Sequence, residues 1–347
     1  MFSRVEKIIF GKESKMGCKI SRIEYFLPKN VLTNEELERS SGRWNADKIE
    51  KKIGIRQRHI ARADETALDM AYEASVKVLQ GFDKNNIDFI LLCTQSPDYF
   101  LPTSACILQE KLGLRTDVGA FDFNLGCSGY IYGLAAAKGF IQSGVARTVL
   151  LVVSETYSRF IHEKDYSNRT IFGDGSAATI IEKDKEEFIF EFVLGTDGKG
   201  WDKLLVPYGG LRHRYDPGAE ATEDESGNLR TPNNLYMNGS EIFNFSIERV
   251  PKLVTQVLQK NQLSMDAIDY FIFHQANRYM TEYLRKKIEI PQEKFFQDML
   301  HTGNTVSASI PIALKETLNQ GVVKQGDRIL LCGFGVGYSW GAVVIKI

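Results

Sequence analysis

The sequence predicts an α/β fold built from two duplicated halves. Apolar, strand-like runs alternate with helical patterns along the chain of 347 residues. The same series of motifs occurs twice, once in each half. Because the strand-like runs are apolar with little alternation, we expect sheets that are largely buried on both faces, with helices packed against them.

The first repeated unit is a helix end followed by an apolar strand. Residues 78–80 read Val-Leu-Gln and are followed by the run 87–93, and residues 257–259 again read Val-Leu-Gln and are followed by 268–274. In this register Cys93 and His274 are counterparts. Each residue closes a predicted strand, where a side chain can emerge at the carboxyl edge of a sheet.

The second repeated unit is a turn, a helix and a strand. Gly-Cys-Ser at 126–128 leads to a helix and the stretch 143–151, and Gly-Asn-Thr at 303–305 leads to a helix and 320–331. A glycine-rich strand region follows in each half, at 170–181 and 331–344. Cys127 and Asn304 are therefore counterparts. A pseudo-twofold axis between halves spanning 16–186 and 187–347 would bring such strand ends to one central site.

Cys127 is the first candidate for chemistry. The apolar run 118–123 stops at 124–126, and a helical pattern rich in small residues then extends through 135–137. The thiol is expected at the start of this helix, where unpaired N–H groups and the helix dipole favour the thiolate, a nucleophile for thioesters. A buried, inert cysteine is the alternative on this local pattern alone.

His274 and Asn304 supply the other polar groups that an acyl-transfer site needs. His274 ends an apolar run, and Asn304 follows a glycine just before a helical stretch at 311–319. Taken singly, the histidine could be structural and the asparagine a turn or capping residue. Cys127, His274 and Asn304 together in one chain favour a shared catalytic site, although only the fold can bring them together.

Over nearly its whole length the chain resembles the 3-oxoacyl-acyl carrier protein synthase III enzymes, which belong to the thiolase-fold condensing enzymes. The matching segments are 54–60, Gly-Cys-Ser-Gly at 126–129, Phe-Gly-Asp-Gly at 172–175, His-Gln-Ala-Asn at 274–277, Gly-Asn-Thr at 303–305 and the glycine-rich 333–341. The resemblance implies a five-layer α-β-α-β-α fold and a Cys-His-Asn catalytic set. The family-like sequence begins at Met16, so residues 1–15 are interpreted as an N-terminal extension, with an artefact of start-site choice as the alternative.

The residue type at the third position of the catalytic set differs between branches of the thiolase-fold superfamily. Elongating ketoacyl synthases use two histidines, and thiolases carry a Gly-His-Pro type motif with a second catalytic cysteine. Asn304 fits the initiating, type III branch. Cys332 lies at the end of the apolar run 329–331 and is expected to be a small core residue rather than a second catalytic thiol.

The resemblance implies a decarboxylating Claisen condensation with no metal and no cofactor. Cys127 takes an acyl group from acyl-CoA, and His274 and Asn304 stabilise the enolate formed from a malonyl thioester, which is expected to be malonyl-acyl carrier protein. Backbone N–H groups of Cys127 and Val336 form the oxyanion hole. The alternative function is a non-condensing acyltransferase that moves the acyl group from Cys127 to a hydroxyl or amine in surface polysaccharide or secondary metabolism.

The resemblance also implies binding surfaces and a homodimer. Phe172 and Leu101 of the partner subunit line the acyl pocket, although Leu101 could instead pack inside its own subunit. Gly239 and Ser240 line a pantetheine tunnel. Basic residues near His274 are candidates for docking the acidic carrier protein: Arg278, Arg285, Lys286 and Lys287. Asn244 and Tyr279, at aligned docking positions, are not basic.

Other site classes are disfavoured by context. The Gly-x-Gly-x-Gly pattern at 333–337 is followed by an apparent strand at 342–347, whereas a dinucleotide site needs a helix there. The five cysteines are odd in number and lack a C-x-x-C pair, so neither a zinc site nor a disulfide framework is expected. Free thiols favour a cytoplasmic location.

The charge and hydropathy of the sequence argue against nucleic-acid binding, a signal peptide and a membrane-spanning segment. The net charge is −1 and the sequence has no basic block, so nucleic acid is not an expected partner. Residues 1–15 carry several charges and no apolar core typical of a signal peptide. The chain also has no apolar run long enough to span a bilayer, and a membrane is not an expected partner.

Residues 209–236 differ from ordinary members of this family. The segment is rich in Gly, Pro and charged residues and is longer than in many relatives, so it should form a surface loop. A solvated excursion is the simpler interpretation. A lid that selects the acyl donor or carrier is the sharper alternative.

Overall fold

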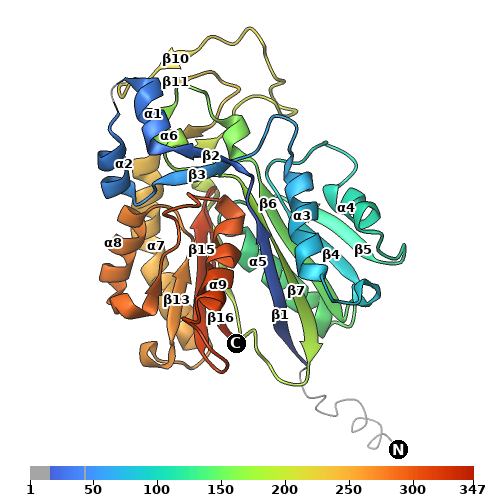
Figure 1. Cartoon of the computed structure of the whole chain (residues 1–347). Helices are drawn as coiled ribbons and strands as arrows, with labels where there is room; N and C mark the ends of the chain where they lie inside the picture. The colour runs from blue at the N-terminus through green and yellow to red at the C-terminus, as the bar shows by residue number, and fades with distance from the viewer. Residues whose placement is uncertain (1–15, 43) are drawn as a thin grey trace, which may run out of the picture.

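Two five-stranded sheets lie side by side at the centre of the computed structural model, which describes residues 16–42 and 44–347 (Figure 1). The proposed extension 1–15 lies outside the described residues. The first sheet has the order β1-β7-β6-β4-β5. Its strands are β1 (Gly17–Phe26), β7 (Gly175–Asp184), β6 (Thr148–Glu155), β4 (Phe89–Cys93) and β5 (Gly119–Phe123).

The second sheet repeats the order and the directions of the first. Its strands are β8 (Val193–Thr196), β16 (Ser339–Lys346), β15 (Arg328–Gly335), β13 (Tyr270–Phe273) and β14 (Phe295–Phe296), in the order β8-β16-β15-β13-β14. In both sheets the first two pairings are antiparallel and the last two are parallel. The predicted duplication is confirmed, with β4 and β13 as equivalent strands. The expected strand after the glycine-rich turn is β16.

Helices complete five layers. The outer face of the first sheet is covered by α3 (Ala67–Leu79) and α4 (Ser104–Leu112), and that of the second by α7 (Gly239–Lys260), with α8 (Arg278–Ile288) beside it. Between the sheets lie α5 (Gly129–Gln142) and α9 (Ser309–Asn319), and each contacts strands of both sheets (Figure 1). The predicted α-β-α-β-α arrangement is confirmed.

The sequence of α5 explains its central position. Of its 14 residues only Lys138 is charged, and small or apolar residues cover the rest of the helix. A helix with so few polar residues suits a position between two sheets, where most of its side chains are buried or half-buried. Lys138 is accommodated by an ion pair with Glu187, whose carboxylate lies 2.8 Å from the ammonium group.

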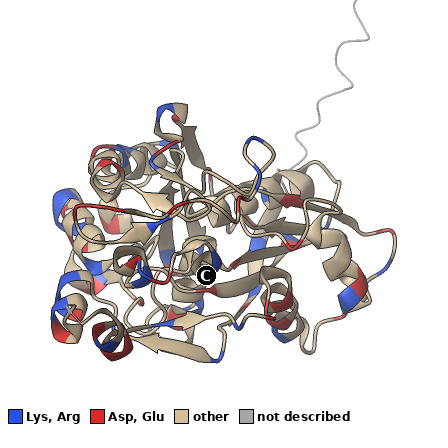
Figure 2. Cartoon of the chain, turned by 90° about the horizontal axis from the view of Figure 1, so that it is seen from above, with Lys and Arg blue, Asp and Glu red and all other residues tan. Residues whose placement is uncertain are grey.

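The remaining α-helices and β-strands belong to neither five-stranded sheet, and those that Figure 1 labels lie above the sheets in its view. They are β2 (Asn30–Thr33), α1 (Asn34–Ser41), α2 (Ala46–Ile53), β3 (Gln57–Ile60), α6 (Tyr166–Arg169), β9 (Leu204–Leu205), β10 (Thr222–Glu223), β11 (Leu229–Arg230) and β12 (Tyr236–Met237). The division expected at 186/187 falls in the connection between β7 and β8. Acidic and basic residues are interspersed over the molecule (Figure 2). Among the described helices, none combines the length and hydropathy needed to cross a membrane.

Candidate functional site

Cys127, His274 and Asn304 line one cavity of about 130 Å³ between the two halves. The residues come from three connections: the turn between β5 and α5, the end of β13, and the stretch before α9. The predicted pseudo-twofold arrangement therefore does bring these three side chains together. The rest of the lining is largely apolar and includes Phe172, Met237, Met280, Phe334 and Val336.

Two glycines of β15 allow Cys127 to approach the second half. A Cβ atom on Gly335 would lie 3.0 Å from the Cys127 Sγ atom, and one on Gly333 would lie 2.9 Å from the Cys127 carbonyl oxygen. Both distances are shorter than a side chain would tolerate, so the glycine-rich strand serves close packing of backbone against the thiol. Ser128 and Ser339 join the same two segments by a hydroxyl–hydroxyl hydrogen bond of 2.5 Å.

The expectation of a stabilised thiolate is wrong. Cys127 does lie just before α5, and its own backbone N–H group favours the thiolate. However, burial, with a smaller contribution from the nearby Glu155 carboxyl, raises the pKa of the Cys127 thiol to about 12. Desolvation outweighs the helix start because the cavity is small and largely apolar. The raised pKa therefore favours the neutral thiol form of Cys127 at neutral pH.

Glu155 is a buried acidic neighbour that the sequence analysis did not single out. It ends β6 and accepts hydrogen bonds from the Gln95 N–H (3.0 Å), the Ser96 hydroxyl (3.4 Å) and the Ser307 hydroxyl (3.1 Å). Burial raises the pKa of Glu155 to about 8, against the opposing effect of these hydrogen bonds. This carboxyl therefore links the first half to the stretch that carries Asn304, through Ser307.

His274 is held at the end of the second sheet. Its backbone N–H donates to the Cys332 carbonyl at 2.8 Å, which extends the pairing of β13 with β15. Its Nδ1 atom lies 2.7 Å from the Ser309 hydroxyl at the start of α9. Burial lowers the pKa of His274 to about 3, so the imidazole is neutral over the physiological pH range. Cys332 is fully buried within β15, as expected of a core residue.

Hydrogen bonds at both of its backbone polar groups hold Asn304 in position. Gly303 adopts a left-handed backbone with φ of 68°, and the Asn304 N–H and C=O groups bond to Ile171 and Gly173 at 2.9 and 3.0 Å. The side-chain oxygen accepts the Val306 N–H at 2.9 Å. This bond leaves the Asn304 NH2 group as the part of the amide that can donate to a ligand.

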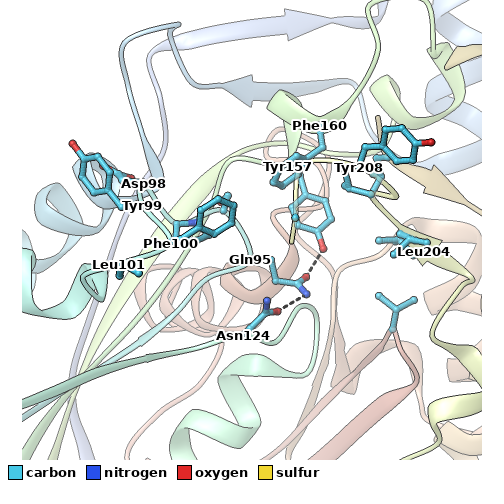
Figure 3. Close-up of a pocket in the computed structure, with 18 residues that line it drawn as sticks. Gln95, Asp98, Tyr99, Phe100, Leu101, Asn124, Tyr157, Phe160, Leu204 and Tyr208 are labelled. Carbon is cyan, nitrogen blue, oxygen red and sulfur yellow. Dashed lines mark hydrogen bonds between the residues drawn. The ribbon is translucent and has the colours of Figure 1, made fainter. Parts of the chain in front are cut away.

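The other predicted binding residues lie in different surroundings. Phe172 is buried in the same cavity as Cys127, and Gly239 also lines it. Ser240 is exposed at the start of α7 and is not part of the lining. Leu101 is 82% exposed, so it does not pack inside its own subunit. It borders a larger cavity of about 870 Å³, which shares Leu204 and Val336 with the small one (Figure 3).

The predicted docking residues lie on α8, whose first turn borders the small cavity through Met280. Arg278 is exposed and packs against Gly54, where no Cβ could be accommodated. Lys286 and Lys287 are also exposed. In contrast, the Arg285 guanidinium is bound to the Glu282 carboxylate at 3.0 Å and to the Ile290 carbonyl at 2.9 Å. These bonds leave it less available to a partner than its three basic neighbours.

The segment 209–236 is a surface loop, as predicted, but hydrogen bonds attach its C-terminal part to the rest of the molecule. Arg230 donates to the fully buried Asp165 carboxylate at 2.6 Å and also bonds to Asp224. Leu235 donates its N–H to the Phe160 carbonyl at 2.7 Å. Gly209, Gly210 and Leu235 line the larger cavity, while the middle of the segment is largely exposed. The middle of the loop is therefore exposed to solvent, and its two ends form part of the wall of the larger cavity.

Across residues 16–42 and 44–347, no group of three or more His, Cys, Asp or Glu side chains is arranged to hold a metal ion. All five cysteines are free thiols.

Comparisons with known proteins agree with this arrangement. Residues 121–198 match the family model of 3-oxoacyl-(acyl-carrier-protein) synthase III, and residues 258–347 match the model of its C-terminal part. The chain is 38% identical to a β-ketoacyl-(acyl-carrier-protein) synthase III of Clostridium perfringens over 95% of this chain and 99% of that protein.

Solved structures are similar over the same length. A 3-oxoacyl-(acyl-carrier-protein) synthase III structure superimposes with a TM-score of 0.94 at 46% identity, over 95% of this chain and all of the other. A 3-oxoacyl-(acyl-carrier protein) synthase from Burkholderia xenovorans gives a TM-score of 0.87 at 35% identity, over 95% and 94% of the two chains. The chain therefore belongs to the 3-oxoacyl-(acyl-carrier-protein) synthase III family.

Proposed function

We propose that this protein condenses an acyl-CoA starter with malonyl-acyl carrier protein, releasing CoA and carbon dioxide and forming a 3-oxoacyl thioester. The observation that carries the proposal is the single cavity lined by Cys127, His274 and Asn304. One nucleophile and two neutral hydrogen-bond donors are the groups that such a condensation needs.

The first step transfers the acyl group to Cys127. The Sγ atom attacks the thioester carbon of acyl-CoA, the carbon–sulfur bond to CoA breaks, and the thiol proton leaves with CoA as its free thiol. The backbone N–H groups of Cys127 and Val336 are our candidates for binding the oxyanion. Because the raised pKa favours the neutral thiol, we expect deprotonation to accompany the attack.

The second step removes carbon dioxide from the malonyl thioester. As the carbon–carbon bond breaks, its electron pair moves into the thioester and charge develops on the thioester oxygen. Neutral donors at that oxygen stabilise the enolate without removing a proton from carbon. We assign this role to His274 and to the Asn304 NH2 group. We also assign the Ser309 hydroxyl as the donor to His274 Nδ1, which places the ring proton on Nε2.

The final step joins the two substrates. The enolate carbon attacks the carbonyl of the acyl-enzyme, and the Cys127 sulfur leaves as a thiolate and takes up one proton. For carrier access we propose the edge formed by the first turns of α7 and α8, where Gly239 and Met280 border the cavity. Ser240 and the exposed basic residues Arg278, Lys286 and Lys287 lie on these helices and suit a pantetheine arm and an acidic carrier, respectively.

A homodimer completes the proposal. Three consecutive large side chains, Tyr99, Phe100 and Leu101, are 60%, 76% and 82% exposed beside the larger cavity. Such an apolar patch suits an isologous interface with a second copy, in which Leu101 of the partner subunit would close the acyl pocket. The five free thiols support a cytoplasmic location as part of the same proposal.

Mass spectrometry of the intact protein tests the proposed reaction. After incubation with individual acyl-CoA donors, Cys127 should carry the acyl group, and adding malonyl-acyl carrier protein should discharge it with formation of 3-oxoacyl-carrier protein. If instead a hydroxyl or amine acceptor discharged the acyl-enzyme while malonyl-carrier protein did not, the non-condensing acyltransferase would be the correct function.

A further inference from the structure

The larger cavity is lined by apolar side chains and by several polar ones (Figure 3). Its apolar lining includes Phe160, Leu204, Val206 and Leu235, which suit an alkyl chain. Three polar side chains, Tyr157, Gln95 and Asn124, are hydrogen-bonded to one another, and we call them the polar triad. The other polar residues of the lining are Ser96, Asp98, Tyr99 and Tyr208. The triad residues come from three separate parts of the first half: the segment after β6, the segment after β4 and the segment after β5.

Direct hydrogen bonds connect the triad. The Tyr157 hydroxyl donates to the Gln95 side-chain oxygen, and the Gln95 Nε2 group donates to the Asn124 Oδ1 atom at 2.9 Å (Figure 3). Tyr157 is buried, Gln95 is half-buried and Asn124 is exposed. The chain of bonds therefore extends from the wall of the cavity to its open side.

The triad still has donor and acceptor groups that can form hydrogen bonds to a ligand. The Tyr157 oxygen can still accept a hydrogen bond, the Gln95 amide has a second N–H group, and across the part of the chain that the structure describes the Asn124 NH2 group makes no hydrogen bond. An alkyl group offers nothing to these atoms, and a carbonyl oxygen can only accept. A hydroxyl group both donates and accepts, so it matches the triad best.

The triad also lies close to the nucleophile. A Cβ atom on Gly126, the residue before Cys127, would lie 2.7 Å from the Gln95 side-chain oxygen and 3.6 Å from the Tyr157 hydroxyl. Tyr157 belongs to the same apolar cluster as Phe172, and Cys127 packs against that cluster. A polar substituent within reach of the triad would therefore lie only a few atoms from the thioester carbon.

We propose that the starter accepted by Cys127 is a short acyl group with a hydroxyl substituent near its thioester, recognised by the Tyr157–Gln95–Asn124 triad. This inference rests on the proposed acylation of Cys127 and specifies its substrate class. The apolar walls hold the carbon chain, and the triad exchanges hydrogen bonds with the hydroxyl group. Unsubstituted donors leave the triad without those bonds, and a site built around a substrate hydroxyl discriminates against analogues that lack it.

Matched pairs of donors test the inference. The rate of Cys127 acylation is measured for each enantiomer of 3-hydroxybutyryl-CoA against butyryl-CoA, and of 3-hydroxyhexanoyl-CoA against hexanoyl-CoA. We expect at least one hydroxylated donor to exceed its unsubstituted partner in kcat/KM by roughly ten-fold or more. Equal rates, or faster acylation by the unsubstituted donors, would overturn the inference and leave the proposed function intact. No acylation by any donor would overturn both.

Variants assign the preference to the triad. Tyr157→Phe removes only the hydroxyl and should reduce the preference to about two-fold or less, by slowing the hydroxylated donor alone. Asn124→Ala should also reduce the preference for the hydroxylated donor. Because Asn124 is exposed, this variant can still be tested if Tyr157→Phe does not fold. Tyr215→Phe makes the same chemical change at an exposed residue of the loop and should change neither rate. A preference that survives both triad variants contradicts the assignment.

Discussion

The Nδ1 atom of His274 lies 2.7 Å from the hydroxyl oxygen of Ser309, although the two residues are 35 positions apart in sequence. His274 ends the second sheet and Ser309 begins α9, so the hydrogen bond fixes the imidazole against the central helix layer. With the hydroxyl donating to Nδ1, the proton of the neutral ring stays on Nε2, the nitrogen that we assign to the enolate.

Ser309→Ala should therefore slow condensation by roughly ten-fold, the effect of one lost hydrogen bond of about 1.4 kcal/mol. Acylation of Cys127 should keep its rate, because His274 is not assigned to that step. Ser309→Thr retains a hydroxyl and should recover most of the activity. Stopped-flow measurement of acylation beside steady-state condensation separates the two steps. Equal slowing of both steps would contradict the positioning role.

Gly335→Ala should abolish acylation. The added methyl group would lie 3.0 Å from the Cys127 Sγ atom and 2.9 Å from its Cβ atom, so either the thiol or the strand must move. Gly139→Ala is the matched control, since a Cβ at that position in α5 meets no atom within 4 Å. The control should keep full activity and gain up to about 1 kcal/mol of stability, as expected for Gly to Ala inside a helix. Normal acylation by Gly335→Ala would refute the close-packing argument.

Glu155 should make the folded protein less stable as the pH rises. Its pKa is raised from 4.5 to about 8 on folding, so between these values the folded state holds a proton that the unfolded state has lost. The contribution is therefore fully present below pH 4.5 and lost as the pH approaches 8, with a size on the order of a few kcal/mol. Glu155→Gln keeps a neutral acceptor and should flatten this decline.

Urea unfolding at a series of pH values measures the effect. Between pH 4.5 and 8 the midpoint of the wild-type protein should fall relative to that of Glu155→Gln. His274 acts in the opposite direction, because its pKa is lowered from 6.5 to about 3 and stability is lost as the pH falls through that window. Parallel curves for the two proteins would show that Glu155 has no raised pKa.

Leu101→Phe should shift acylation toward shorter donors. In the proposed dimer this side chain reaches the acyl pocket of the neighbouring subunit, and the larger ring would shorten that pocket. Alkylation of Cys127 by a small reagent should not change, because the thiol itself is untouched. Light scattering must also give the mass of a dimer at working concentration. A monomer, or an unchanged chain-length profile, would contradict this proposal.

Much of the fold could be predicted because it is repeated in the sequence. The runs ending at Cys93 and His274 became equivalent strands, and the turns at Cys127 and Asn304 became equivalent helix starts. Because each unit occurs twice, its secondary structure can be inferred from two segments of the chain. A single short apolar run does not distinguish a helix from a strand. The glycine-rich turn was separated from a dinucleotide site by the strand that follows it, which is β16.

The parts that were missed depend on contacts between distant residues. Ser309, Glu155 and Tyr157 lie in unremarkable local sequence, and their partners are 35, 152 and 62 positions away. The ionisation of Cys127 was mispredicted for a related reason. The helix start is visible in the sequence, but the desolvation that outweighs it arises in a cavity lined by residues of both halves.

The most direct test of the proposed mechanism is the release of labelled carbon dioxide from malonyl-carrier protein by enzyme already acylated at Cys127. His274→Ala and Asn304→Ala should accept the acyl group normally, as judged by intact mass, yet release carbon dioxide at least a hundred-fold more slowly than wild type, since each lacks one enolate donor (roughly 10²–10³ for one donor). Cys127→Ala should form no acyl-enzyme. Release at near wild-type rate by the His274 variant would contradict the roles assigned to this site.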